Sequence, residues 1–271
     1  MPYLSRLILP AAFGLAYAVA GVPASHSQER AGWLERCEER SSRNQVTVCA
    51  EKEMTLPAAR GKLVVNARPN GGITVTGGAR RDVRLVARIQ AHARREGDAR
   101  AILEEIEVLT DGEIRATGPR TGDNEGWSVS FVLDVPRASD LGLTSTNGGI
   151  SVEGVSGDLE LTTTNGGLML AAVAGSVRGR TRNGGVTVDL DGSGWQGSGL
   201  DLETTNGGVR LRVPERYNAR LETGTVNGGL QFDFPVTVQG RMRRQLTTDL
   251  GSGGAPIRVV TTNGGVTVQR K

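Results

Sequence analysis

Seven copies of the triplet Asn-Gly-Gly constrain the fold of this chain more than any other feature of its sequence. Successive copies are 77, 18, 18, 23, 21 and 36 residues apart. Because the last spacing is twice 18, we interpret the segment LTTDLG at 246–251 inside it as a degenerate copy. A recurring period of this kind is typical of repeat architectures, in which small units stack on their neighbours. The triplets begin at Asn70, Asn147, Asn165, Asn183, Asn206, Asn227 and Asn263.

Residues on both sides of each triplet alternate between apolar and polar. The positions six before, three after and five after the asparagine are apolar in all seven copies, as Leu159, Leu168 and Leu170 illustrate. Since successive side chains of a strand point to opposite faces, this pattern predicts two short strands per copy that bury the same side. The position two before the asparagine carries a small hydroxyl residue in six copies: Ser145, Thr163, Thr181, Thr204, Thr225 and Thr261.

The predicted unit is therefore a strand, an Asn-Gly-Gly turn, a second strand and a second turn. We expect the turn at these residues because Asn and Gly tolerate positive φ. One unit cannot bury its apolar face alone, so units must stack. The predicted fold class is all-β, a repetitive parallel β-solenoid with one short helix. An antiparallel β-meander or sandwich is the alternative, because an Asn-Gly hairpin would place the same positions on one face.

The signs of the charged residues favour the parallel solenoid. Five residues before the asparagine, successive copies carry Glu160, Arg178 and Asp201. In a parallel solenoid these residues would lie about 4.8 Å apart on neighbouring strands, whereas in a meander a returning strand would separate them. Six residues after the asparagine the signs alternate again, in the order Asp189, Arg212, Asp233.

A different segment lies between the first two copies. Residues 83–91 and 127–135 alternate as strands, and apolar residues from Ala99 to Ile106 recur at helical spacing. We expect a short helix near 98–107, with Asp98 as its N-cap, that covers a sheet edge or one end of the solenoid. The sequence thus predicts a first β unit at 61–136 and an Asn-Gly-Gly repeat domain at 137–271.

The amino-terminal residues indicate export. Arg6, an apolar run over 7–22 and small residues after it predict a signal peptide at 1–27, cleaved after Ala24 or Ser27. The run is short for a transmembrane anchor, and no later segment is long and apolar enough to cross a membrane. An oxidising compartment, periplasmic or at the cell surface, would favour a disulfide between Cys37 and Cys49 in the segment 28–60. Two buried free thiols are the alternative.

The repeated Thr-Thr-Asn-Gly-Gly units, the cysteine pair and the strand, helix, strand, Val-Pro passage resemble the adhesin-like domains of unknown function called toast-rack domains. The resemblance covers roughly residues 45–271. It implies a β-solenoid-like fold in bacterial envelope proteins with no established catalytic activity, and it supplies no functional residues.

The sequence offers little of the chemistry that catalysis needs. His92 stands in an alternating strand between Ala91 and Ala93, a setting typical of a structural or surface histidine. The acidic column that contains Glu160 also contains Arg178, which favours a solvated face over a polysaccharide-cleaving site. Calcium-binding β-rolls carry an aspartate in every repeat, and these copies do not. We therefore expect no catalytic residues, no metal and no cofactor.

Two insertions are candidate binding loops. Residues 192–199 could present an exposed Trp195 for recognition, or Trp195 could instead cap the core. The second insertion carries Arg241, Arg243 and Arg244, which could contact anionic envelope polymers or lipid headgroups or could simply be solvated.

These patterns predict an exported, non-enzymatic, adhesin-like scaffold with binding or structural roles in the cell envelope. The alternatives are a β-helix enzyme that acts on polysaccharide and an envelope sensory module that docks to a partner. We expect an envelope polymer or protein as the partner. A nucleic acid is not expected, because an exported protein does not meet it.

Overall fold

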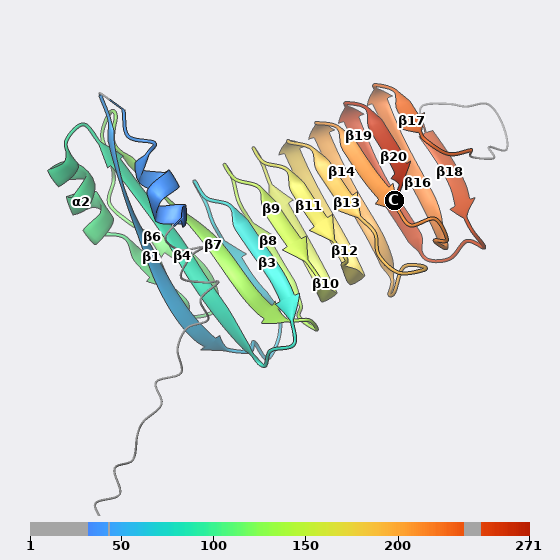
Figure 1. The fold of residues 1–271 in the computed structure, drawn as a ribbon, viewed down its shortest axis with the longest axis horizontal. Coiled ribbons are helices and arrows are strands. Elements are labelled where there is room, and N and C mark those ends of the chain that lie inside the picture. Colours follow the sequence, from blue (N-terminus) through green and yellow to red (C-terminus); the bar gives the residue numbers. More distant parts are fainter. Residues whose placement is uncertain (1–31, 43, 236–244) are drawn as a thin grey trace, which may run out of the picture.

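Two ten-stranded sheets make up the core of the molecule (Figure 1). The computed structural model describes residues 32–42, 44–235 and 245–271. The predicted signal peptide and the three arginines Arg241, Arg243 and Arg244 therefore lie outside the described residues. One continuous apolar cluster, from Val65 to Val268, fills the space between the sheets.

Each sheet receives one strand from every repeat. We call the two sheets I and II. The first strand of a repeat joins sheet II and the second joins sheet I, so the Asn-Gly-Gly turn crosses from one sheet to the other. Sheet I contains, in spatial order, β1 (Val46–Pro57), β4 (Asp82–Ala93), β7 (Gly126–Pro136), β3 (Ile73–Gly78), β9 (Ile150–Glu153), β11 (Leu168–Ala171), β13 (Val186–Asp189), β15 (Val209–Val213), β20 (Val266–Arg270) and β17 (Leu230–Phe232). Sheet II contains β5 (Glu107–Leu109), β6 (Glu113–Thr117), β2 (Leu63–Asn66), β8 (Leu141–Thr144), β10 (Ser156–Thr163), β12 (Ala174–Asn183), β14 (Gly199–Asn206), β19 (Pro256–Asn263), β16 (Ala219–Asn227) and β18 (Gln245–Leu250).

Equivalent positions of the repeats pair directly, which confirms the parallel solenoid. Strands β10, β12 and β14 are parallel neighbours, and Leu159, Val177 and Leu200 lie opposite one another. All three side chains are buried in the core, as the alternation of apolar residues predicts. The meander alternative is wrong, since no returning strand separates these three.

The stacking order differs from the sequence order at both ends of the repeat array. The last unit, β19 and β20, inserts between the unit β14–β15 and the unit β16–β17. At the other end, β2 and β3 lie between the β6–β7 pair and the β8–β9 unit. Both the first and the last repeat of the chain are therefore interior layers of the stack.

Antiparallel strands occur only near the two ends of the described stack. Strands β1, β4 and β7 pair antiparallel at one end of sheet I, and β5 pairs antiparallel with β6. Strand β18 runs antiparallel to β16, so the interpretation of 246–251 as a degenerate repeat is wrong. The segment LTTDLG has neither the asparagine nor the paired glycines with which a turn would stack on its neighbours.

The α-helix expected near residue 98 is α2 (Glu96–Glu104), and it covers the inner side of β1 and β4 at one end of the stack (Figure 1). It begins earlier than predicted: the N-cap residue is Arg95, not Asp98, and Arg95 forms no side-chain capping bond. Asp98 instead lies in the first turn, where its charge favours the helix dipole. Buried Ala99 and Ile102 close the core there.

A second helical segment, residues 32–38, lies against β1 and β4. A disulfide joins Cys37 to Cys49 of β1, with the two Cα atoms 6.3 Å apart. The predicted bridge is thus present, and it fits an oxidising compartment. Among the described residues, no helix is both long and apolar enough to cross a membrane.

Candidate binding surfaces

The seven motif asparagines form one hydrogen-bonded ladder along an edge of the stack. Each Asn after Asn70 donates a side-chain N–H to the Oδ1 of the Asn in the adjacent layer, with N–O distances of 2.7 to 2.9 Å. The ladder follows the spatial order, so Asn263 stands between Asn206 and Asn227. The side-chain amide thus supplies a donor and an acceptor at each layer, which an aspartate or a serine could not do in the same geometry.

A second ladder runs just inside the first. The hydroxyl two residues before six of the seven motif asparagines donates to the carbonyl oxygen of the first motif glycine in the adjacent layer, at 2.6 to 2.8 Å. Thr163 and Gly148 are one such pair. The six hydroxyl residues are buried, so this bond satisfies an oxygen that would otherwise be costly to bury.

The motif glycines are required by close approach between layers. A Cβ on Gly166 would lie 2.2 Å from the carbonyl oxygen of Gly148, and the first glycine of every other copy meets a similar backbone oxygen. The expectation of positive φ at the motif is wrong, because among the motif residues only Gly264 has a positive φ, at 159°. Packing, rather than a left-handed conformation, explains the repeated glycine.

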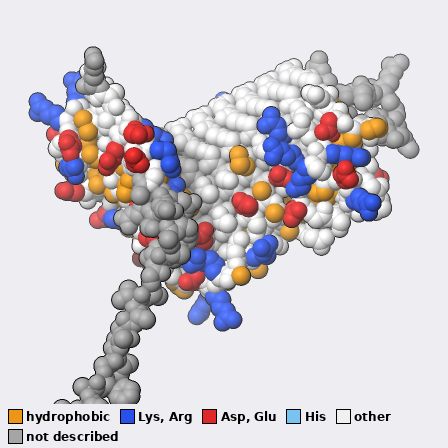
Figure 2. Space-filling view, viewed as in Figure 1, with side chains coloured by type: hydrophobic (Ala, Val, Ile, Leu, Met, Phe, Trp, Pro, Cys, Tyr) orange, Lys and Arg blue, Asp and Glu red, His pale blue; other side chains and the backbone are white. Residues whose placement is uncertain are grey.

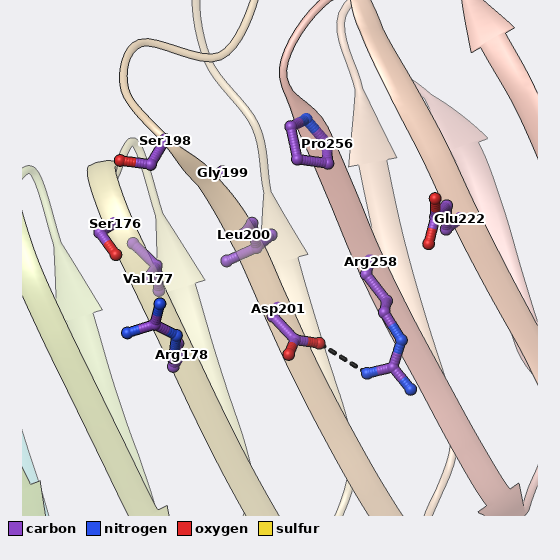
Figure 3. A pocket seen from close by; sticks show the side chains of 10 residues that line it. All are labelled: Ser176, Val177, Arg178, Ser198, Gly199, Leu200, Asp201, Glu222, Pro256 and Arg258. Atoms are coloured by element: carbon purple, nitrogen blue, oxygen red, sulfur yellow. Dashed lines mark hydrogen bonds and ion pairs between the residues drawn. The ribbon is translucent and has the colours of Figure 1, made fainter.

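The outer face of sheet II carries a column of alternating charges. In spatial order the column is Glu160, Arg178, Asp201, Arg258, Glu222. Arg258 donates to Asp201 at 2.6 Å, and both side chains lie in a shallow hollow of about 300 Å³ together with Arg178 and Ser198 (Figure 3). Each carboxylate in the column is adjacent to a guanidinium. This arrangement differs from the facing pair of carboxylates that glycoside cleavage requires.

Lys62 reaches the end of this column. Its ammonium lies 3.0 Å from Asp158 and 3.1 Å from Glu160. Hydrogen bonds to Asp158 and Glu160 raise the pKa of Lys62 above its usual value. These side chains are 31% to 54% exposed, so solvent weakens the pairs and they order the face more than they stabilise the fold.

Trp195 lies inside the protein and is not an exposed recognition residue. Its side chain is only 7% exposed, and its indole N–H donates to the carbonyl oxygen of Gly175 at 3.0 Å. The expectation that Trp195 is exposed for recognition is therefore wrong, and the alternative, in which it caps the core, is the one observed. His92 lies in β4 with its ring against Gly126, so glycine at 126 provides the space for the imidazole.

The outer face of sheet I is different in character. Figure 2 shows a pale region with few charged side chains over the middle strands of the stack. A groove of about 680 Å³ lies between residues 33–40 and this face, and its floor crosses β7, β3, β9, β11 and β13. Trp33, Arg40 and Arg88 form one wall. Thr74, Ser130, Ser151, Met169 and Thr187 are on the floor.

Sequence reasoning did not single out these groove residues. Met169 occupies an outward position of a repeat, where its exposure of 56% is unusual for a large apolar side chain. An outward methionine was therefore the one signal in the sequence that could have pointed to this groove. The wall could not be anticipated, because only the disulfide and the fold bring Trp33 over the outer face of sheet I.

The two-sheet stack, with its asparagine and hydroxyl ladders, defines a β-solenoid repeat protein. The match to the family described as Toastrack DUF4097 covers residues 109–269 of the chain. The chain belongs to this family. No curated protein matches it at a significant level.

Three solved structures resemble the chain at low sequence identity. A proposed cell adhesion protein from Clostridium sporogenes is 11% identical, covers 82% of this chain and 100% of its own, and has a TM-score of 0.46. A proposed adhesin from Bacteroides fragilis is 8% identical, with coverages of 82% and 97% and a TM-score of 0.31. One from Parabacteroides distasonis is 7% identical, with coverages of 81% and 96% and a TM-score of 0.32.

Proposed function

We propose that this chain is an exported, non-catalytic scaffold that binds other components of the cell envelope through the outer faces of its two sheets. The observation that carries the proposal is the layered stack itself. Its ladders hold outward side chains of successive repeats at a fixed spacing on broad, flat faces. Such an array suits the recognition of an extended partner, as the concave surfaces of other repeat proteins do.

The charged column on sheet II supports a binding role over a catalytic one. In this column Asp201 is bonded to Arg258. On sheet I, Asp189 is likewise paired, 3.5 Å from Arg212 and 2.5 Å from Lys271. A carboxylate that pairs with a neighbouring cation is not placed to face a second carboxylate across a sugar, which is the arrangement that glycoside cleavage requires. The disulfide supports export, because such bonds persist in oxidising compartments.

Sedimentation with isolated envelope fragments tests the proposal. The chain from residue 28 onward should co-sediment with the fragments, and no new reducing sugar ends should appear during the incubation. The reduced, alkylated and unfolded chain is the control for non-specific adsorption. Equal sedimentation of that control would contradict a binding scaffold. Release of reducing ends by the folded chain would instead favour the polysaccharide-cleaving enzyme.

A further inference from the structure

The groove on the outer face of sheet I has a preformed aromatic and cationic wall. The helical segment 32–38 is anchored to β1 through the Cys37–Cys49 disulfide. The Arg88 guanidinium lies 5.4 Å from the centre of the Trp33 ring, and its Nε donates to Glu51 at 2.9 Å. Arg40 donates to the Oε1 of Gln90 at 3.2 Å. These contacts fix Trp33 and both arginines over the sheet, so little order is lost when a ligand binds there.

The floor of the groove is a row of small polar side chains with one large apolar side chain, Met169, among them. Thr74, Ser151, Met169 and Thr187 occupy equivalent outward positions of neighbouring strands and pair in register. Parallel strands place such positions about 4.8 Å apart, so the floor repeats along the stack. Because the groove crosses five neighbouring strands, a ligand that fills it must be elongated.

The groove retains positive charge. Its lining side chains include Arg40 and Arg88 and no aspartate or glutamate. Glu51, whose side chain is 5% exposed, lies beside Arg88 on the neighbouring strand and neutralises it. The bonded partner of Arg40 is the neutral amide of Gln90, so the Arg40 charge stays available to an anionic group.

We propose that this groove binds a linear polysaccharide that carries carboxylate groups. Hydroxyl and amide groups on the floor and wall exchange hydrogen bonds with sugar hydroxyls, the Trp33 ring covers an apolar face of a sugar, and Arg40 pairs with a carboxylate. A lipid surface would require a cluster of several basic residues, which this groove lacks. The inference rests on the proposed binding scaffold and names the ligand class of one face.

A negative or a positive charge introduced at Met169 tests the groove without disturbing the fold, because this side chain is exposed on the floor. We would titrate the chain from residue 28 onward with oligomers of polygalacturonate and of alginate, and with neutral dextran, by calorimetry. Both acidic oligomers should bind at least tenfold more tightly than dextran. Met169→Glu should weaken that binding about tenfold, whereas Met169→Lys should leave it unchanged or strengthen it.

Thr205→Glu is the matched control, because it adds the same charge to the outer face of sheet II, outside the groove. It should leave oligomer binding unchanged. Equal binding of dextran, no binding of either acidic oligomer, or no response to the sign of the charge at residue 169 would overturn the proposal. If Met169→Glu still co-sediments with envelope fragments as the unsubstituted chain does, the scaffold stands and the groove assignment fails.

Discussion

The first glycine of each motif is under a much tighter steric constraint than the second. A Cβ at Gly207 would lie 2.1 Å from the carbonyl oxygen of Gly184, whereas a Cβ at Gly208 would meet Gly265 at an ordinary 3.5 Å. Neither glycine has a positive φ. The two adjacent glycines therefore look equivalent in sequence and differ in what a methyl group would cost.

We expect Gly207→Ala to destabilise the protein by about 2 kcal/mol or more, because the backbone of one layer must move away from the next. Gly208→Ala, the matched control, should change the free energy of unfolding by no more than about 0.5 kcal/mol. Urea unfolding of both variants measures the difference. Equal effects would show that layer spacing does not require the first glycine.

Tyr217 connects the stability of the fold to alkaline pH. The side chain is 3% exposed, and burial, followed by the charge of Asp191, raises its pKa to about 12. The folded protein therefore keeps the phenol proton more tightly than the unfolded chain, whose tyrosine titrates near about 10. Its contribution to stability is full below about pH 10 and is lost as the pH rises toward 12.

We expect Tyr217→Phe to remove this part of the pH dependence. Between about pH 10 and 12, the unsubstituted protein should lose up to about 2 kcal/mol more stability than the phenylalanine variant. Other titrating groups are the same in both chains, so they cancel in the comparison. Urea unfolding at pH 7 and at pH 11 gives the values, and identical losses in the two chains would refute the assignment to Tyr217.

At the scale of strands, the apolar alternation was enough to predict the buried faces, and the alternating charges favoured parallel stacking, but the apolar pattern does not give the order of the layers. Val209, Leu230 and Val266 occupy equivalent slots with similar side chains, so the pattern cannot tell which unit is next to which. Charge held the missing information. Sequence order would place Asp201 beside Glu222, and the observed order places Arg258 between them. Like charges on adjacent strands are unfavourable, and the insertion of β19 removes that contact.

The candidate surfaces were predictable only in part. The turn asparagines and the disulfide follow from local patterns, whereas the groove depends on contacts between residues far apart in the chain. The predicted exposure of Trp195 was wrong because a glycine-rich loop gives no periodic signal that would show which side chains are buried. An indole can be buried when one carbonyl oxygen accepts its N–H, as that of Gly175 does here. Burial of such loops is decided by neighbouring layers.

Engineered cysteine pairs distinguish the two layer orders. Arg212 pairs with Gln269 in register, and β20 separates Arg212 from Asp233. We expect Arg212→Cys with Gln269→Cys to form a disulfide under mild oxidation, because adjacent parallel strands bring their Cα atoms within bonding range. Arg212→Cys with Asp233→Cys, the control pair that sequence order would favour, should stay reduced. Peptide mapping reads both results, and the reverse outcome would show sequential stacking.

At the scale of the whole molecule, the out-of-order units tie both ends of the chain into the stack. At one end, the layer of β16 and β17 has only β18 outside it, next to β16, and it stacks on β19 and β20, which come last in the sequence. At the other end, α2 covers the core next to β1 and β4 (Figure 1). In a sequential solenoid a lost terminal repeat removes only an outer layer. Here the loss of the last repeat would remove an interior one.

A chain that ends at Gly254 tests this dependence. It keeps every residue of β16 and β17 but lacks their parallel neighbours, which leaves β16 with only its antiparallel partner β18 and β17 with none. Amide hydrogens over 219–232 should therefore lose protection against exchange, most of all those of β17. Layers from β8 to β13 lie away from the missing unit and should keep their protection, which makes them an internal control. Hydrogen exchange with mass spectrometry measures both regions in one sample. Unchanged protection over 219–232 would mean that β16 and β17 stack without β19 and β20, and would contradict the interior position of the last repeat.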